Sequence, residues 1–136
     1  MNTRMNHDDL IVTTSRTAED ILHDDLCSLD HEEAWILYLT SRNSVIGKEM
    51  ISRGTVYSTS IDCRTVLRNA LLNNAAGIIL FHNHPSGNPS PGTADVRFTK
   101  KLHDACSLMD IRLLDHIIVS GERFYSFDEE KTCRHI

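Results

Sequence analysis

The chain has 136 residues and a mass of 15.4 kDa, which suits a single domain. Hydrophobic residues make up 40% of it and charged residues 24%, so a packed core is expected and wholesale disorder is excluded. The formal net charge of −5 gives no general affinity for nucleic acid, and no apolar run approaches the roughly 18 residues that a membrane helix needs. The N-terminus lacks the apolar centre of a signal peptide, so we expect a cytoplasmic protein.

Residues 1–14 are polar, and we expect them to be a flexible N-terminus before one domain that spans residues 15–136. The first predicted helix begins at Thr17, because a threonine followed by Asp20 is typical of an N-terminal cap with an acid in the first turn. Its buried stripe is expected to hold Ile21, Leu22 and Leu26.

Apolar runs separated by turn residues predict the next elements. These are a buried strand at 34–39, a hairpin partner at 45–52, an extension of the sheet at 56–59, a helix from Ser60 or Asp62 to about 74, and a buried strand at 76–81.

Residues 82–93 contain all three prolines of the chain and two of its glycines, which predicts a loop. A helix capped by Thr93 should then reach residue 109, and a closing hairpin should follow at 111–119 and 123–127. The residues of this helix expected to face inward are Val96, Leu102, Cys106 and Met109. The order of elements predicts an α/β fold, a mixed β-sheet sandwiched by helices.

Two histidines at the end of the 76–81 strand indicate a metal site. His82 and His84 are two residues apart, so their rings point to one face of the strand. Asp95, in the first turn of the next helix, supplies an oxygen ligand if the rigid loop folds back over the strand end. Three protein ligands leave a fourth position for water, as in a catalytic zinc site. The alternative is that the histidines are hydrogen-bonded core residues and that Asp95 only complements the helix dipole.

A hydrolytic zinc site also needs a base that accepts a proton from water. Glu32 and Glu33, just before the first strand, are the candidates, and the residues alone leave the choice between them open. Both could instead be solvated charges at the start of a strand.

The segment H-N-H-P-S-G-N-P-S-P-G-T-A-D, residues 82–95, resembles the JAMM motif H-x-H-x7-S-x2-D of the JAB1/MPN metalloproteases. The sequences before and after it, L-L-N-N-A-A-G-I-I-L and L-L-D-H-I-I-V, are similar to those of RadC-type proteins. This resemblance covers roughly residues 15–128. It implies a cytidine-deaminase-like JAB1/MPN core, Zn²⁺ bound by His82, His84 and Asp95, and Glu32 as general base and then acid.

The reaction that the resemblance implies is hydrolysis of an amide or isopeptide bond in a peptide or protein substrate. The RadC name carries an association with DNA repair, but the residues give no strong sign of nucleic-acid binding or of a membrane partner. Many relatives carry a helical segment before this domain, and the roughly 30 residues here are expected to be too few for one. Whether the chain forms a homo-oligomer is left open.

The sequence departs from the motif at Gly92, where the family has serine. That hydroxyl is expected to hold the reacting water and the developing oxyanion, and Ser90 and Thr93 are nearby substitutes at a different spacing. A catalytically weak or silent domain that binds a protein partner is therefore the alternative function. His116 is expected to support the site rather than to bind the metal.

Overall fold

The computed structural model describes residues 2–4, 10–54 and 62–136. The described residues form a seven-stranded sheet whose strand order is β1-β3-β2-β4-β5-β6-β7. The strands are β1 (Asn2–Arg4), β2 (Glu33–Leu39), β3 (Val45–Arg53), β4 (Gly77–Asn83), β5 (Arg112–Ser120), β6 (Arg123–Ser126) and β7 (Lys131–Arg134).

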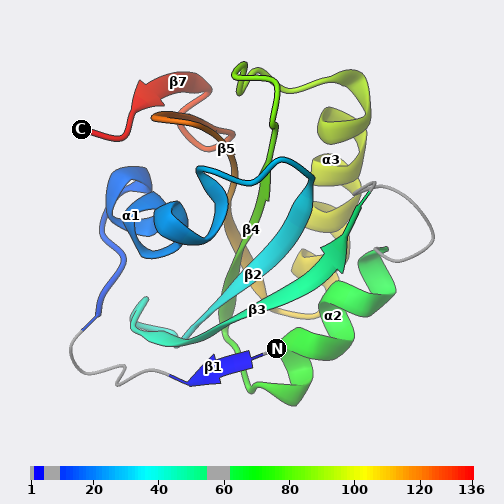
Figure 1. Ribbon diagram of the computed structural model, residues 1–136. Coiled ribbons are helices and arrows are strands. Elements are labelled where there is room, and N and C mark those ends of the chain that lie inside the picture. Colours follow the sequence, from blue (N-terminus) through cyan, green and yellow to red (C-terminus); the bar gives the residue numbers. More distant parts are fainter. Residues whose placement is uncertain (1, 5–9, 55–61) are drawn as a thin grey trace.

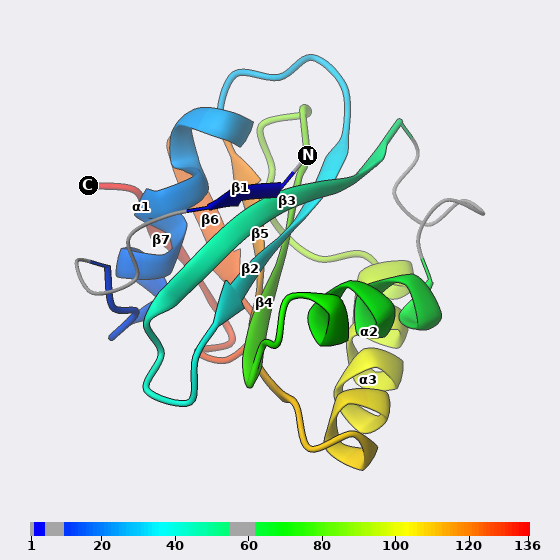
Figure 2. The same cartoon turned by 90° about the horizontal axis from the view of Figure 1, so that it is seen from below.

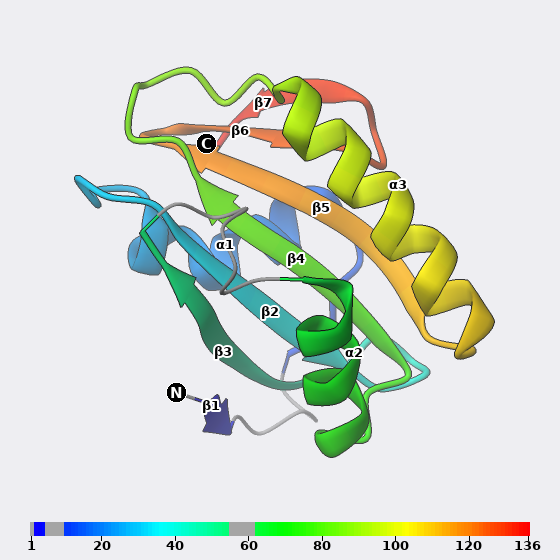
Figure 3. The ribbon, with the colours of Figure 1, turned by 90° about the vertical axis from the view of Figure 1, so that its right-hand side faces the viewer.

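The helices form a layer on each side of this sheet (Figure 1). α1 (Ser15–Leu26) covers one face, and α2 (Cys63–Leu72) and α3 (Thr93–Leu108) cover the other. The view from below shows α2 and α3 side by side on their face, and the side view shows α1 behind the sheet (Figures 2 and 3). The predicted α/β sandwich is thus confirmed.

One strand pair gives the sheet its mixed character. β4 and β5 run parallel, whereas the other neighbouring strands are antiparallel. A parallel pair needs a crossover, and α3 supplies it. The segment from the end of β4 to the start of α3 therefore lies at the carboxyl edge of the central strands, where ligand sites form in α/β sheets.

The two faces of the sheet bury separate apolar clusters, because successive side chains of a strand point to opposite faces. In β2, Ile36 and Tyr38 pack toward α2 and α3, whereas Leu37 and Leu39 pack toward α1. Every residue of β4 is buried, as expected of a central strand covered on both sides.

Two of the three helix caps differ from the sequence predictions, and for α2 the structure selects one of the two predicted residues. α1 begins at Ser15, and its cap is Thr14, whose hydroxyl accepts from the Thr17 amide at 3.1 Å. Asp62, not Ser60, caps α2 by accepting from the Thr65 amide at 2.7 Å. The predicted Thr93 cap of α3 is also wrong, because the N-cap is Gly92.

Several other expectations need correction. β4 continues through Asn83, so the predicted loop starts two residues later than expected. Of the four α3 residues expected in the core, Leu102 and Cys106 are buried as predicted, whereas Val96 and Met109 are 51% and 46% exposed. Strands β1 and β7 were not predicted, and the expected strand at 56–59 lies outside the described residues.

All four cysteines are free, and two of them, Cys63 and Cys106, lie in the core. Among the described residues, none of the helices is both long and apolar enough to cross a membrane.

Candidate metal centre

The three predicted ligands meet at the carboxyl end of β4, and together they are called the His82 centre. His82 Nε2 lies 3.0 Å from Asp95 Oδ1 and 3.1 Å from His84 Nε2. His84 Nε2 lies 3.5 Å from Asp95 Oδ2. Both rings project from the face of the sheet that α2 and α3 cover, and Asp95 reaches them from the first turn of α3. The loop between β4 and α3 thus brings Asp95, eleven residues after His84, into contact with both imidazoles.

A chain of hydrogen bonds behind His82 fixes its tautomer. The Thr99 hydroxyl donates to the Asp95 carbonyl at 2.6 Å, since a carbonyl oxygen can only accept. The same hydroxyl oxygen lies 2.5 Å from His116 Nδ1, so that nitrogen is the donor. His116 Nε2, 2.9 Å from His82 Nδ1, then accepts from His82. The lone pair of His82 Nε2 is left facing His84 and Asp95.

The other two ligands are also held from behind. His84 Nδ1 lies 3.1 Å from the Asn88 carbonyl, to which it must donate, and this again leaves a lone pair on Nε2. The Ser120 hydroxyl donates to the His84 carbonyl. Asp95 Oδ2 accepts the Gly92 amide at 2.7 Å, which fixes the carboxylate while satisfying the start of α3. Each ligand therefore has its remaining polar group occupied by the protein.

The arrangement fits a divalent cation. Two nitrogen lone pairs and a carboxylate converge within 4.8 Å of one another, and that concentration of negative potential is unfavourable without a positive charge between them. Ligands of a tetrahedral zinc ion at about 2.0–2.1 Å lie roughly 3.3–3.4 Å apart, which the observed separations resemble. Two nitrogens and one oxygen are a donor set that zinc accepts.

Burial and charge act differently on the two histidines. Burial lowers the pKa of His82, against the opposing effect of Asp95. The hydrogen bond with Asp95 raises the pKa of the more exposed His84. Burial also lowers the pKa of His116 well below its ordinary value, which keeps this ring neutral behind His82. His116 contacts a ligand without contacting the position between the ligands, as the sequence predicted.

The two glutamates lie in different surroundings. Glu33 binds His31 Nε2 at 2.7 Å and Trp35 Nε1 at 3.0 Å, on the face that α1 covers. Glu32, one residue earlier, has the side-chain parity of Ala34, which pairs with His82. Its charge opposes the lowering of the His82 pKa and contributes to the raised pKa of His84. Glu32 is thus the glutamate within electrostatic reach of His82 and His84.

Asn83, between the two histidines, positions the segment that carries Glu32. Its amide nitrogen donates to the His31 carbonyl at 2.8 Å, and its amide oxygen accepts the Glu33 amide at 2.7 Å. The Glu32 carbonyl accepts from the Gly54 amide at 2.8 Å. Sequence reasoning missed Asn83, Thr99 and Asn88, because their roles depend on groups far away in the chain or on loop shape.

The glycine at the motif serine position has room for a side chain. Gly92 has a φ of −89°, which any residue can adopt. A Cβ atom there would have one neighbour within 4 Å, Asp95 Oδ2 at 3.7 Å. Ser90 and Thr93, the expected substitutes, are exposed. The serine hydroxyl is therefore missing only because residue 92 is glycine, and the backbone there would accept a serine.

This site and fold define a JAB-type domain, and comparison with known proteins agrees. Residues 12–132 match the family of RadC-like JAB domains, to which the chain belongs. It is 41% identical over 119 residues to a UPF0758 protein of Flavobacterium johnsoniae, covering 88% of this chain and 52% of that protein. It is 43% identical over 117 residues to the UPF0758 protein YfjY of Escherichia coli K12, covering 86% and 73%. The chain thus spans about half of the first relative and about three quarters of the second.

Proposed function

We propose that this protein is a zinc-dependent hydrolase, a metallopeptidase that cleaves an amide or isopeptide bond in a peptide or protein substrate. The observation that supports it most is the pair of imidazole lone pairs and the buried carboxylate that converge at the His82 centre. His82, His84 and Asp95 would hold the ion. A zinc ion bound by three protein ligands lowers the pKa of water and polarises a carbonyl oxygen.

The rest of the chemistry falls to the chain's own residues. Glu32 lies outside the ligand set but within electrostatic reach of both histidines, so its carboxylate can take a proton from the attacking water. The same carboxylic acid can then give that proton to the leaving amine. His116 and Thr99 hold His82 in the tautomer that the ion needs.

A catalytically silent protein-binding domain is the second candidate, and Gly92 is the observation in its favour. Without the serine hydroxyl, the oxyanion of the reaction loses one donor, which costs about 100–1,000-fold in rate in other enzymes. We propose that the protein acts in the cytoplasm, and the residues give no strong sign of nucleic-acid binding. A DNA-repair role has no support beyond the name of the family.

The test compares two adjacent and isosteric substitutions, Glu32→Gln and Glu33→Gln. On the zinc-loaded protein with a panel of quenched fluorogenic peptides and isopeptides, Glu32→Gln should lower kcat by about 100–10,000-fold and keep its zinc. Glu33→Gln should retain most of the activity, because its carboxylate faces His31 and Trp35. Equal activity of Glu32→Gln and wild type would refute the proposed base. No turnover above a chelator-treated control on any amide would favour the binding domain.

A further inference from the structure

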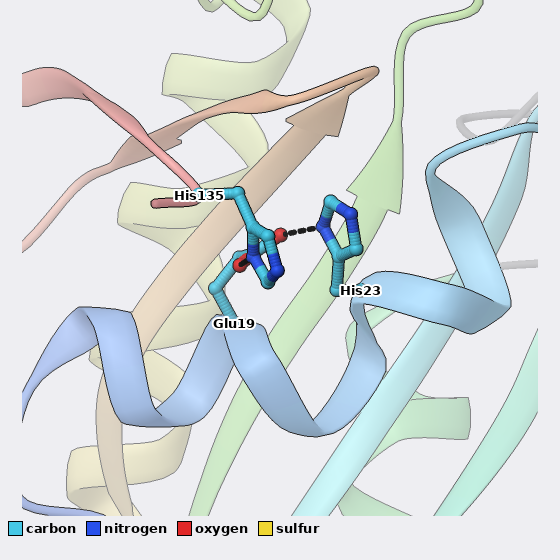
Figure 4. A group of neighbouring side chains, drawn as sticks. All are labelled: Glu19, His23 and His135. Carbon is cyan, nitrogen blue, oxygen red and sulfur yellow. Dashed lines mark hydrogen bonds and ion pairs between the residues drawn. The ribbon is translucent and has the colours of Figure 1, made fainter.

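A second group of metal-binding side chains lies between α1 and the C-terminal tail. Glu19 and His23 are one turn apart on α1, and His135 follows β7 near the end of the chain (Figure 4). These three residues are called the tail cluster. Nδ1 of His23 is 2.6 Å from one carboxylate oxygen of Glu19, and Nδ1 of His135 is 2.6 Å from the other. The three ligand atoms lie within 4.8 Å of one another.

The tail cluster is enclosed, which sets it apart from surface charge clusters. The Glu19 side chain has no exposed area, and the side chains of His23 and His135 are 7% and 15% exposed. A buried carboxylate is costly unless cations or hydrogen-bond donors surround it. Two histidines contact this one carboxylate: His23 on the same helix, and His135, which is 116 residues away from Glu19 in the chain.

An outer carboxylate is within hydrogen-bond distance of one imidazole, and another lies farther from the second. Nε2 of His23 lies 2.8 Å from Glu122 Oε2, and Nε2 of His135 lies 3.8 Å from Asp20 Oδ1. A carboxylate on the far nitrogen of a histidine favours the tautomer that carries the proton there. At 2.6 Å each Nδ1 also shares a proton with Glu19, and a bound metal ion takes the place of that proton. Histidine ligands of metal ions typically have such outer partners, which also make the imidazole a stronger ligand.

The tail itself is fixed in place around His135. The His135 amide donates to the Glu122 carbonyl at 2.8 Å. The Arg16 guanidinium donates to the His135 carbonyl at 2.8 Å and to the Arg134 carbonyl as well. These bonds keep the His135 backbone beside α1 whether or not its ring moves.

We propose that Glu19, His23 and His135 form a second site for a divalent transition metal, with zinc as the ion that suits two imidazoles and one carboxylate best. It lies on the α1 face of the sheet, opposite the His82 centre, and does not depend on the proposed hydrolase function. Its role is to fasten the C-terminal tail to α1.

Binding requires a movement of one ring. The imidazoles of His23 and His135 now stack, with centroids 3.5 Å apart and planes 11° from parallel. A metal ion that binds both imidazoles must lie in the plane of each ring. Two parallel planes share no such position, so one ring must tilt. The His135 ring is the one that moves, because it is the more exposed and sits on the tail rather than on a helix. The Zn²⁺ affinity of the tail cluster is therefore lower than that of the His82 centre.

Zinc stoichiometry in four proteins tests the proposal. Titration with Zn²⁺ against a chromophoric chelator should give two ions per chain for wild type, one for Asp95→Ala, one for His135→Ala and none for the double variant. His103→Ala should keep both ions, because His103 lies exposed on α3, where its ring forms an ion pair with Asp104. Zn²⁺ should raise the Tm of Asp95→Ala by several degrees and leave that of the double variant unchanged. Far-UV circular dichroism checks that each variant is folded. His135→Asn, a second replacement of the same imidazole, checks that a loss of zinc in His135→Ala does not come from misfolding.

The outcomes separate the two sites. A folded Asp95→Ala that binds no Zn²⁺ would overturn the proposal and leave the tail cluster as a hydrogen-bonded clasp. An unchanged stoichiometry in His135→Ala and His135→Asn would overturn it as well. If wild type binds one ion that His135→Ala removes and Asp95→Ala retains, the second site stands and the proposed hydrolase function fails.

Discussion

The His82 centre and the tail cluster have the same donor types, two imidazoles and one carboxylate, but they are built differently. In the His82 centre the rings of His82 and His84 are tilted by 59°, and their Nε2 atoms face each other at 3.1 Å. In the tail cluster the rings are nearly parallel, and each Nδ1 faces an oxygen of Glu19. The first arrangement can accept an ion as it stands. In the second, the histidine nitrogens share protons with Glu19 until a ring moves.

The groups that face the far nitrogen of each histidine also differ between the two sites. Neutral groups, His116 and the Asn88 carbonyl, hold the histidines of the His82 centre. Carboxylates, Glu122 and Asp20, face those of the tail cluster. Neutral partners keep the first site preorganised without adding charge, and rigid elements carry its ligands. Two candidate metal sites with the same residue types thus differ in preorganisation, and that difference ranks their expected affinities.

The largest effect is expected where the His82 centre lacks a catalytic group. Gly92→Ser places a hydroxyl beside Asp95, in a backbone conformation that serine adopts without strain. If that hydroxyl aligns with the oxyanion, kcat on a peptide or isopeptide should rise by up to about 100–1,000-fold. Zinc content at both sites should stay constant, and Ser90→Ala, an exposed change in the same loop, should leave kcat unaltered.

A zinc-loaded Gly92→Ser with no gain would have two meanings, which the wild type separates. Beside a fast wild type, it would show that another group already performs the task. Beside an inert wild type, it would favour the protein-binding domain over the hydrolase.

A pH effect on stability should arise on the α1 face of the sheet, away from both sets of ligands. Burial raises the pKa of Asp115 to about 6, although Ser126, the Asp128 amide and the His116 amide donate to its carboxylate. The folded state therefore holds this proton more tightly than the unfolded state, whose pKa is about 3.9. The stabilisation is complete below about pH 4 and is lost as the pH rises through 6, by up to about 3 kcal/mol.

Urea unfolding of wild type and Asp115→Asn between pH 4 and pH 7 measures this contribution. The advantage of wild type over Asp115→Asn should shrink as the pH rises, because asparagine does not titrate. Parallel curves would mean that the three hydrogen bonds keep the carboxylate ionised throughout.

The smallest effect concerns the support of the His82 centre. His116→Phe removes the acceptor of His82 Nδ1 and keeps an aromatic ring beside Phe127, on which His116 now stacks at 4.7 Å. Zn²⁺ affinity of the His82 centre should fall by about 10–100-fold, and that of the tail cluster should not change. His103→Phe is the matched control. Equal losses at both sites would point to general destabilisation of the fold instead.

Much of the fold followed from local patterns. The apolar runs of β2 and β4 and the proline-rich loop depend on periodicity and backbone chemistry that each segment carries by itself. The missed elements lack such a signal: β7 is largely exposed and exists because β6 offers it an edge. The inward face of α3 was also mispredicted at Val96, because the packing of the helix on the sheet, not its sequence alone, decides which side is buried.

The sequence by itself predicted that His82, His84 and Asp95 form one site, since the two histidines are two residues apart at a strand end and Asp95 lies in the first turn of the next helix, and the structure brings the three together. The residues alone could not choose between Glu32 and Glu33, and only the family resemblance favoured Glu32. In the structure Glu32 lies within electrostatic reach of His82 and His84, whereas Glu33 binds His31 and Trp35. The tail cluster lay beyond any local pattern. Only the folding of the chain brings His135 to Glu19 across 116 residues, and contacts of that range depend on the packing of the whole domain.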